Sequence, residues 1–248
     1  MKRKQIYHEF IAELLGTLIL VLIGDGSCAM NSLFNLGGYT NITIAWGIAV
    51  LLGILVSNRI SGAHLNPAVT IALVLTKRFP KVKICHYLIG QMLGGFIGAY
   101  LVYYFYQAKL LIVDPNLIHS AGIFATFPAV NLFMPSLMSE IIATAVLLFG
   151  ILAIVEHFNN DKAVFLAPFA VSLLIVGIGM ALGGMHGYAM NPARDFSPRL
   201  LTAIIGFKQN GLNDGSNIWI VPVIGPLIGG PVGALIYDLT IAKKHTEQ

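Results

Sequence analysis

The sequence contains few charged residues, which excludes most classes of soluble protein. Only 10% of its 248 residues are Asp, Glu, Lys or Arg, whereas 56% are hydrophobic, and the mean hydropathy is +0.79. Three stretches, at residues 26–58, 163–191 and 215–237, contain none of these four residue types. Each stretch exceeds the ~20 residues that a helix needs to cross a bilayer. The composition therefore predicts an integral membrane protein in a lipid bilayer.

Other absences narrow the function. The sequence has no Gly-x-Ser-x-Gly nucleophile elbow and no phosphate-binding loop, so nothing in it supports an enzyme. His64 and His186 have no carboxylate or cysteine at ligand spacing, and we expect neither a metal nor another cofactor. The two cysteines, Cys28 and Cys85, fall toward opposite sides of the predicted membrane, which disfavours a disulfide between them.

The positive charge follows the ends of the predicted spans. The formal net charge is +4, but the basic residues do not form one face, so we expect no nucleic-acid partner. Most of them fall on one predicted side: Lys2, Arg3, Lys4, Arg59, Lys77, Arg78, Lys81, Lys83, Lys162, Lys243 and Lys244. The positive-inside rule then places both termini in the cytoplasm. No small-residue cleavage site follows a short apolar region near the N-terminus, so we expect a retained first helix in a plasma-membrane protein.

Two Asn-Pro-Ala segments, at 66–68 and 191–193, each predict the start of a helix. Proline is tolerated at the first helical position, and asparagine is a preferred N-cap. The helix after Pro67 can continue only to about Thr76, before the charged residues and Pro80 that follow. About ten residues span about 15 Å, half of a ~30 Å hydrocarbon core. A similar helix follows Pro192, to about Ile205, so the sequence predicts two half-helices that meet near mid-membrane.

The two halves of the sequence repeat each other. Residues 12–17 resemble residues 139–144, and the glycines at 90, 94 and 98 recur at 225, 229 and 233. We expect these glycines to let helices pack backbone to backbone. Six membrane helices are predicted, at 9–30, 40–59, 84–107, 136–155, 163–182 and 217–239. Each half has three, so the second half enters the membrane from the opposite side.

The expected fold is therefore an all-α integral membrane protein with six transmembrane helices and two re-entrant half-helices in an inverted repeat. We assign residues 1–248 to a single domain. The first repeat covers residues 7–107, an external connector covers 108–135, and the second repeat covers 136–240.

Three acidic residues within the apolar spans require an explanation. Glu13 and Glu140 lie at equivalent places in the two repeats, and each would cost about 2.5–3.5 kcal/mol to insert unpaired. We expect each carboxylate to accept hydrogen bonds from the N–H groups of a re-entrant loop, which has no helical ladder. A proton-relay pair is the alternative. We expect Asp25 to lie at a solvated or capped outer helix end.

The loops before the two half-helices are the candidate solute path, because irregular backbone is tolerated at membrane depth where it lines a water-filled cavity. The predicted pore-lining carbonyls are those of Gly62, Ala63, His64, Leu65, Met185, His186, Gly187 and Tyr188. Opposite an apolar wall, such acceptors suit neutral hydroxyl-bearing molecules, and Asn66 and Asn191 add donors at the centre. We expect His64 to bond within its loop, while His186 could touch the outer vestibule.

The paired Asn-Pro-Ala segments resemble those of the aquaporin, or major intrinsic protein, family, and Arg194-Asp195 is similar to its glycerol-facilitator branch. The resemblance covers nearly the whole chain. It implies a selectivity filter of Trp46, Gly179, Tyr188 and Arg194. Glycine at 179 replaces the histidine typical of water-specific members and leaves room for two aromatic faces, while Arg194 donates to hydroxyl groups. Tyr188 replaces the phenylalanine common in bacterial glycerol facilitators.

The resemblance also implies that Glu13 and Glu140 brace the loops, that Asp195 holds the outer loop through backbone donors or Arg199, and that the chain forms homotetramers. The expected function is a passive channel for glycerol, other small uncharged solutes and water that excludes ions and protons. A water-selective channel is an alternative, which Gly179 and Asp195 disfavour. An ion-coupled transporter is another, because inverted repeats and paired glutamates occur in transporters.

Overall fold

The structure is a computed structural model that describes residues 3–158 and 164–242. All regular elements in these two ranges are helical. The α-helices are α1 (Arg3–Phe34), α2 (Gly38–Ser61), α3 (Pro67–Leu75), α4 (Ile84–Val113), α5 (Phe133–His157), α6 (Ala167–Leu182), α7 (Pro192–Ile205) and α8 (Ile220–Tyr237). Shorter turns are η1 (Lys81–Lys83), η2 (Ser120–Ile123), η3 (Val164–Leu166) and the π-helical η4 (Asp238–Ala242).

Within the described residues, six helical segments are long and apolar enough to cross a membrane, namely those containing α1, α2, α4, α5, α6 and α8. They confirm the six predicted spans, although several boundaries differ. α1 already starts at Arg3, and α4 continues to Val113, into the region predicted as connector. Position 163, the predicted start of the fifth span, lies outside the described residues, as do Lys2, Lys162, Lys243 and Lys244.

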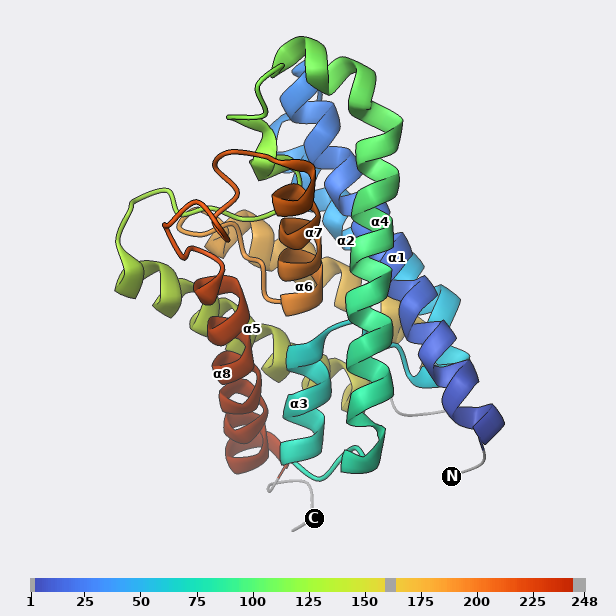
Figure 1. Cartoon of the computed structure of the whole chain (residues 1–248). Helices are drawn as coiled ribbons and strands as arrows, with labels where there is room; N and C mark the ends of the chain where they lie inside the picture. Colours follow the sequence, from blue (N-terminus) through green and yellow to red (C-terminus); the bar gives the residue numbers. More distant parts are fainter. Residues whose placement is uncertain (1–2, 159–163, 243–248) are drawn as a thin grey trace.

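The two short helices confirm the half-helix prediction. α3 has 9 residues and α7 has 14, too few to cross a bilayer at about 1.5 Å per residue. Figure 1 shows them starting at a similar mid-height and running in opposite directions, α3 toward the end where α1 begins and α7 away from it. The pair completes one further membrane crossing.

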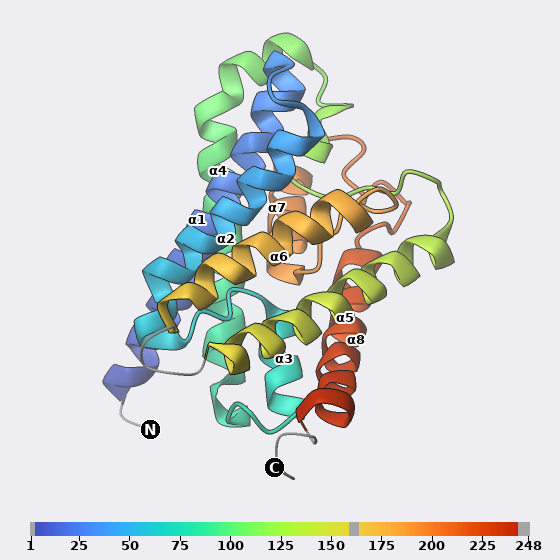
Figure 2. The same cartoon turned by 180° about the vertical axis from the view of Figure 1, so that it is seen from behind.

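The long helices surround these half-helices with the symmetry of an inverted repeat. α1 packs along α4 as α5 packs along α8 (Figure 1). Behind them α2 packs against α6 (Figure 2), where Ser172 Oγ donates a hydrogen bond of 2.8 Å to the carbonyl of Gly47. The half-helices lie between α8 and α4, with α3 packed mainly on α8 and α7 mainly on α4 (Figure 1).

The repeated glycines bring the helices of each pair into backbone contact, as predicted. A Cβ atom at Gly94 would overlap the carbonyl oxygen of Leu14 on α1, and one at Gly229 would overlap that of Ile141 on α5. Gly90, Gly98 and Gly233 likewise meet carbonyl oxygens of these partner helices, and Gly225 meets the Cβ atom of Glu140 on α5. Small residues at a spacing of four allow this approach, which gives close van der Waals contact where lipid supplies no hydrophobic force between helices.

Gly94→Ala should destabilise the protein, because the added methyl group must push α4 away from α1. Overpacking of this kind costs about 1–3 kcal/mol, so the thermal midpoint in detergent should fall. Gly177→Ala is the matched control, since a Cβ atom at this membrane-helix position meets nothing within 4 Å. Equal thermal midpoints for the two variants would contradict backbone packing at Gly94.

Candidate functional site: the central cavity

Both re-entrant loops have the same unusual backbone. Gly62, Ala63 and Leu65 have φ angles of 82°, 54° and 54°. In the second loop Gly187, Tyr188 and Met190, at 81°, 42° and 51°, repeat the pattern. Left-handed geometry costs about 1–2 kcal/mol for a residue with a Cβ atom, and such strain persists only where the surroundings impose it. Apart from Gly62 and Gly187, nothing in the sequence predicts this left-handed backbone.

The two asparagines join the loops to each other. Asn66 Oδ1 accepts the N–H of Ala68, and Asn191 Oδ1 accepts that of Ala193, so both side chains are the predicted N-caps. Their amide nitrogens cross over: Asn66 Nδ2 donates to Met190 O and Asn191 Nδ2 donates to Leu65 O, both at 2.8 Å. Each Nδ2 has two protons and uses one here, so one remains for a solute.

Glu13 supports the first loop from α1. Its Oε1 accepts the N–H of His64 at 3.0 Å and the hydroxyl of Ser61 at 2.6 Å. Its Oε2 accepts the N–H of Leu65 at 2.8 Å and an amide proton of Gln91 at 2.7 Å. The side chain is fully buried, so this carboxylate replaces the hydrogen-bond acceptors that a helix would give the loop.

Glu140 supports the second loop from α5 in the same way, with fewer hydrogen-bond partners than Glu13. Its two carboxylate oxygens accept the N–H groups of Ala189 at 2.9 Å and Met190 at 2.8 Å. Neither Glu13 nor Glu140 is among the residues that line the central cavity. The geometry is therefore that of a brace behind each loop.

Glu140→Gln should destabilise the protein, because the amide NH2 group would face a loop N–H that then has no acceptor. An unpartnered buried N–H costs about 1–3 kcal/mol, and the thermal midpoint should fall accordingly. The neighbouring Ser139→Ala, which removes only a hydroxyl bonded to its own helix, should have much less effect. Equal thermal midpoints for the two variants would show that the hydrogen bonds from the second loop to Glu140 do not stabilise the protein.

The loops line a cavity of about 760 Å³ that continues past both asparagines. Trp46, Tyr188 and Arg194 line one end, and Arg78 and Tyr237 line the other. Much of the wall is aliphatic and comes from α2, α3, α5 and α6: Val50, Ile54, Val69, Leu147, Ile151 and Ile175. The cavity thus has loop backbone and amide groups on one side and hydrocarbon on the other.

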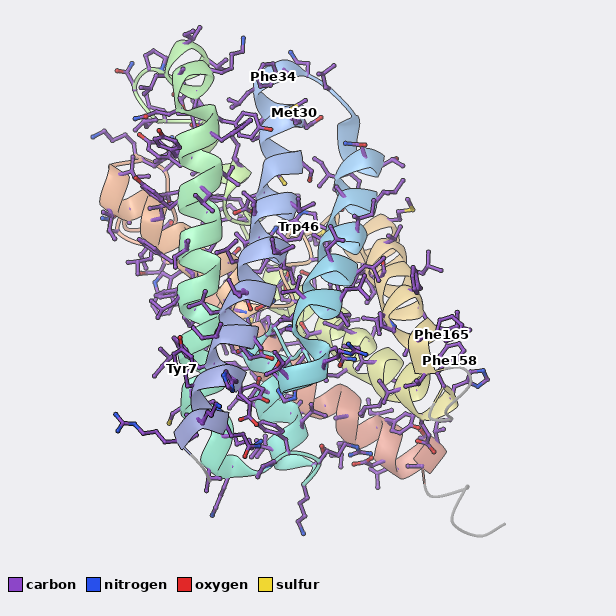
Figure 3. All side chains as sticks on the ribbon, turned by 90° about the vertical axis from the view of Figure 1, so that its right-hand side faces the viewer. Tyr7, Met30, Phe34, Trp46, Phe158 and Phe165 are labelled. Carbon is purple, nitrogen blue, oxygen red and sulfur yellow. The ribbon has the colours of Figure 1, made fainter. Side chains whose placement is uncertain are left out.

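The structure brings all four predicted filter residues together. The guanidinium carbon of Arg194 lies 4.1 Å from the ring centroid of Trp46, and Trp46 is at the height where α1 and α2 run side by side (Figure 3). A Cβ atom at Gly179 would come within 2.9 Å of Tyr188 Cζ. Gly179 therefore leaves the space that the Tyr188 ring occupies.

The second loop differs from the prediction in which residues line this cavity. Gly62, Ala63, His64 and Leu65 of the first loop do so as predicted. In the second loop Tyr188 lines the cavity as predicted, but Ala189 and Met190 do so in place of Met185, His186 and Gly187. The carbonyl of Met185 accepts the N–H of Ala129 at 3.0 Å. The connector thus binds the Met185 carbonyl, which was predicted to face solutes, because the chain makes a turn at 183–187 before it reaches the cavity.

The two loop histidines differ from the expectations. His64 lines the cavity and bonds outside its loop, because Nδ1 lies 3.1 Å from Thr70 Oγ1 on α3 and the ring packs against Phe79 and Tyr87. The His186 side chain is only 1% exposed, so it does not reach the outer vestibule as considered above. Asp25 is likewise buried, with 0% exposed, and not at a solvated helix end.

Asp195 connects the second half-helix to the outer connector. Its Oδ1 accepts Arg199 Nε at 2.9 Å, and its Oδ2 accepts the N–H and the hydroxyl of Thr126, both at 2.7 Å. Arg199 is fully buried and also donates to the carbonyls of Thr126 and Asn210. Both partners considered from the sequence, backbone donors and Arg199, are present.

The connector begins with a smaller anchor of the same kind outside the membrane spans. Asp114 accepts the N–H groups of Ile118, His119 and Ser120 and the hydroxyl of Ser120. Burial by itself raises the pKa of this carboxyl group, but these hydrogen bonds outweigh it and lower the pKa. Asp114 thus stays ionised and holds the turn after α4.

Arg199→Lys should strongly destabilise the outer face, because an ammonium group cannot supply the planar fork of donors that reaches three acceptors. Incomplete pairing of a buried ion pair costs about 3–5 kcal/mol. Arg78→Lys, at a partly exposed ion pair with Asp238, should cost about 0–1 kcal/mol. Chemical-denaturant unfolding of both variants tests the difference, and similar losses would contradict it.

Comparison with known proteins agrees with this geometry. The sequence model of the major intrinsic protein family matches residues 1–237. A probable glycerol uptake facilitator protein of Thermotoga maritima is 44% identical, over 92% of this chain and 97% of that protein. Human aquaporin-9 is 39% identical, over 99% of this chain and 86% of its own.

A solved structure supports the same conclusion. The X-ray structure of the aquaglyceroporin from Plasmodium falciparum superposes with a TM-score of 0.87 at 33% identity, and the match covers 98% of this chain and 100% of that one. The chain therefore belongs to the major intrinsic protein family, as its Asn-Pro-Ala segments predicted, and is a multi-pass membrane protein.

Proposed function

We propose that this protein is a passive channel for glycerol and other small uncharged solutes, and that it also conducts water. The observation that carries the proposal is the arrangement of the four predicted filter residues, in which the Arg194 guanidinium lies over the Trp46 ring and Gly179 leaves room for the Tyr188 ring. The names of two similar proteins, a probable glycerol uptake facilitator protein and an aquaglyceroporin, support it.

In the proposed filter, a polyol presents hydroxyl oxygens on one side and its carbon chain on the other. The fixed donors of Arg194 suit adjacent hydroxyl oxygens, while the rings of Trp46 and Tyr188 suit the carbon chain. Deeper in the cavity, the solute can bind the free amide protons of Asn66 and Asn191 and the loop carbonyls. These hydrogen bonds replace those that the solute loses with water. Such a path exchanges hydrogen bonds stepwise and needs no coupling ion.

Exclusion of ions and protons is part of the proposal. The N-termini of α3 and α7 meet near Asn66 and Asn191 and present the positive ends of two helix dipoles. Arg194 adds a positive charge at the narrow end, a barrier of the kind found in aquaporin-type pores. The engagement of Glu13 and Glu140 with loop N–H groups argues against a proton-relay transporter.

The remaining proposals concern assembly and topology. We infer a homotetramer, one pore in each subunit, in a plasma membrane with both termini in the cytoplasm. Repeat one at 7–107, the connector at 108–135 and repeat two at 136–240 form one channel domain. Crosslinking in membranes and accessibility of labels at each terminus test these points directly.

A double variant, Gly179→His with Tyr188→Cys, tests the proposed filter. A side chain at 179 would meet both the Tyr188 ring and the Thr43 methyl group. The small cysteine removes the larger of these two obstacles, so the imidazole enters the space of the Tyr188 ring and narrows the pore. Glycerol permeability of proteoliposomes should fall about tenfold or more, given what steric exclusion is worth, while water permeability persists. Stopped-flow light scattering under glycerol and water gradients measures both.

Tyr188→Phe, which keeps the ring and removes only its hydroxyl, is the control and should still pass glycerol. Wild-type protein that passes water alone would favour the water-selective channel. Glycerol uptake that saturates and needs a proton or sodium gradient would instead favour a transporter.

A further inference from the structure

A second hollow lies on the outside of the helix bundle, apart from the solute path. It is a groove of about 790 Å³, lined by residues of α1, α2 and α4 and by the turn between α1 and α2. None of these residues lines the central cavity. Figure 3 shows α1 running between α4 and α2 up to Met30 and Phe34. The floor of the groove is therefore α1, and its walls are α4 and α2.

The surface of the groove suits a hydrocarbon chain. Its large exposed side chains are apolar or aromatic, among them Leu36, Tyr104 and Phe105, which are 53%, 70% and 77% exposed. Gly26 keeps the floor open, because a Cβ atom there would meet nothing within 4 Å. The groove lies on helices long and apolar enough to cross the membrane. A concave apolar surface in this place requires a lipid chain or another membrane protein to cover it.

A cation without a counter-charge lies where the groove ends. Lys109 follows Phe105 by one turn on α4, and its Nζ lies 5.4 Å from the centroid of the Phe34 ring. The Phe34 ring packs edge-on against Tyr106, which lines the groove. Lys109 forms no ion pair within residues 3–158 and 164–242. A lysine near the end of a membrane helix places its ammonium group at the depth of the lipid headgroups.

The charges at this end of the molecule favour a lipid over a second copy of the chain. Asp25, Asp114 and Asp195 are at most 5% exposed, so they cannot reach a neighbouring molecule. The exposed Asp214 accepts hydrogen bonds within its own loop. A second copy therefore has no free carboxylate here among its described residues. A lipid phosphate supplies the missing negative charge.

We propose that the groove binds an anionic phospholipid, with one acyl chain along α1 past Gly26 and the phosphate at Lys109. Basic side chains beside pockets between membrane helices favour anionic headgroups. The apolar groove supplies affinity for the chain, and Lys109 supplies selectivity for the headgroup. The inference does not rest on which solute the channel conducts.

Two lipids with the same acyl chains separate the two contributions. Dioleoylphosphatidylglycerol has a net negative charge and dioleoylphosphatidylcholine has none. Wild-type protein in detergent should bind the first about fivefold more tightly, which is what one lysine near an anionic lipid contributes. Lys109→Gln should lose this preference and keep its affinity for phosphatidylcholine. Native mass spectrometry during titration with each lipid gives both dissociation constants.

Lys208→Gln is the matched control for the charge, because Lys208 is an exposed lysine in the loop after α7 and does not line the groove. This variant should keep the wild-type preference for phosphatidylglycerol. An equal loss of preference in the two variants would mean that Lys109 is not the headgroup site.

Filling the groove tests the chain site. Gly26→Leu should weaken the binding of both lipids about tenfold or more, because the leucine side chain occupies the space of the acyl chain. Gly177→Leu is the matched control, since a Cβ atom at Gly177 also meets nothing within 4 Å and Gly177 does not line the groove. If Gly26→Leu does not fold, Ala45→Leu fills the same groove from α2.

Equal affinities of wild-type protein for the two lipids, or wild-type affinities in both groove-filling variants, would overturn the proposal. Inorganic phosphate at the same concentration should not displace phosphatidylglycerol; displacement would mean an anion site that does not use the groove. An interchain disulfide that Gly26→Cys forms in native membranes, and that wild type does not form, would place a second copy in the groove instead.

Discussion

A backbone that leaves its helix inside a membrane loses its hydrogen-bond acceptors, and the rest of this structure depends on how they are replaced. Glu13 and Glu140 supply them to the loops before α3 and α7. Both carboxylates project from long helices, α1 and α5, that their glycine-rich partners α4 and α8 hold in place. Helix packing at the periphery therefore supports the irregular backbone at the centre.

The inverted repeat places a second re-entrant loop opposite the first, and the two loops together line one continuous path. Because the two halves enter the membrane from opposite sides, their half-helices meet with N-termini together, and Asn66 and Asn191 bond across to the opposite loop. The left-handed residues that recur in both loops are strained in isolation, and braces and cross-bonds hold them. The strained loop backbone, the inverted repeat and the positions of the hydrogen-bond acceptors therefore depend on one another.

The two arginines of α7 have different partners, and this difference is the basis of the proposed selectivity. Arg199 and Asp195 form a buried pair that anchors the connector to α7. Arg194 precedes Arg199 by five residues on the same helix. It instead lines the cavity, with its guanidinium over the Trp46 ring. The contrast explains how two arginines on one short helix can differ, one holding the structure and the other available to solutes.

The sequence alone determined the six spans, the two half-helices and their caps, because hydrophobic length and the Asn-Pro-Ala segments are local signals. The repeated glycines also predicted close helix packing, and the two glutamates predicted hydrogen bonds to the re-entrant loops, because the same pattern occurs twice. Only the tertiary structure decided that Met185 bonds the connector through its carbonyl, that His186 is enclosed and that Asp25 is buried. These depend on how a loop and a neighbouring helix approach one another, and no local pattern encodes that distance.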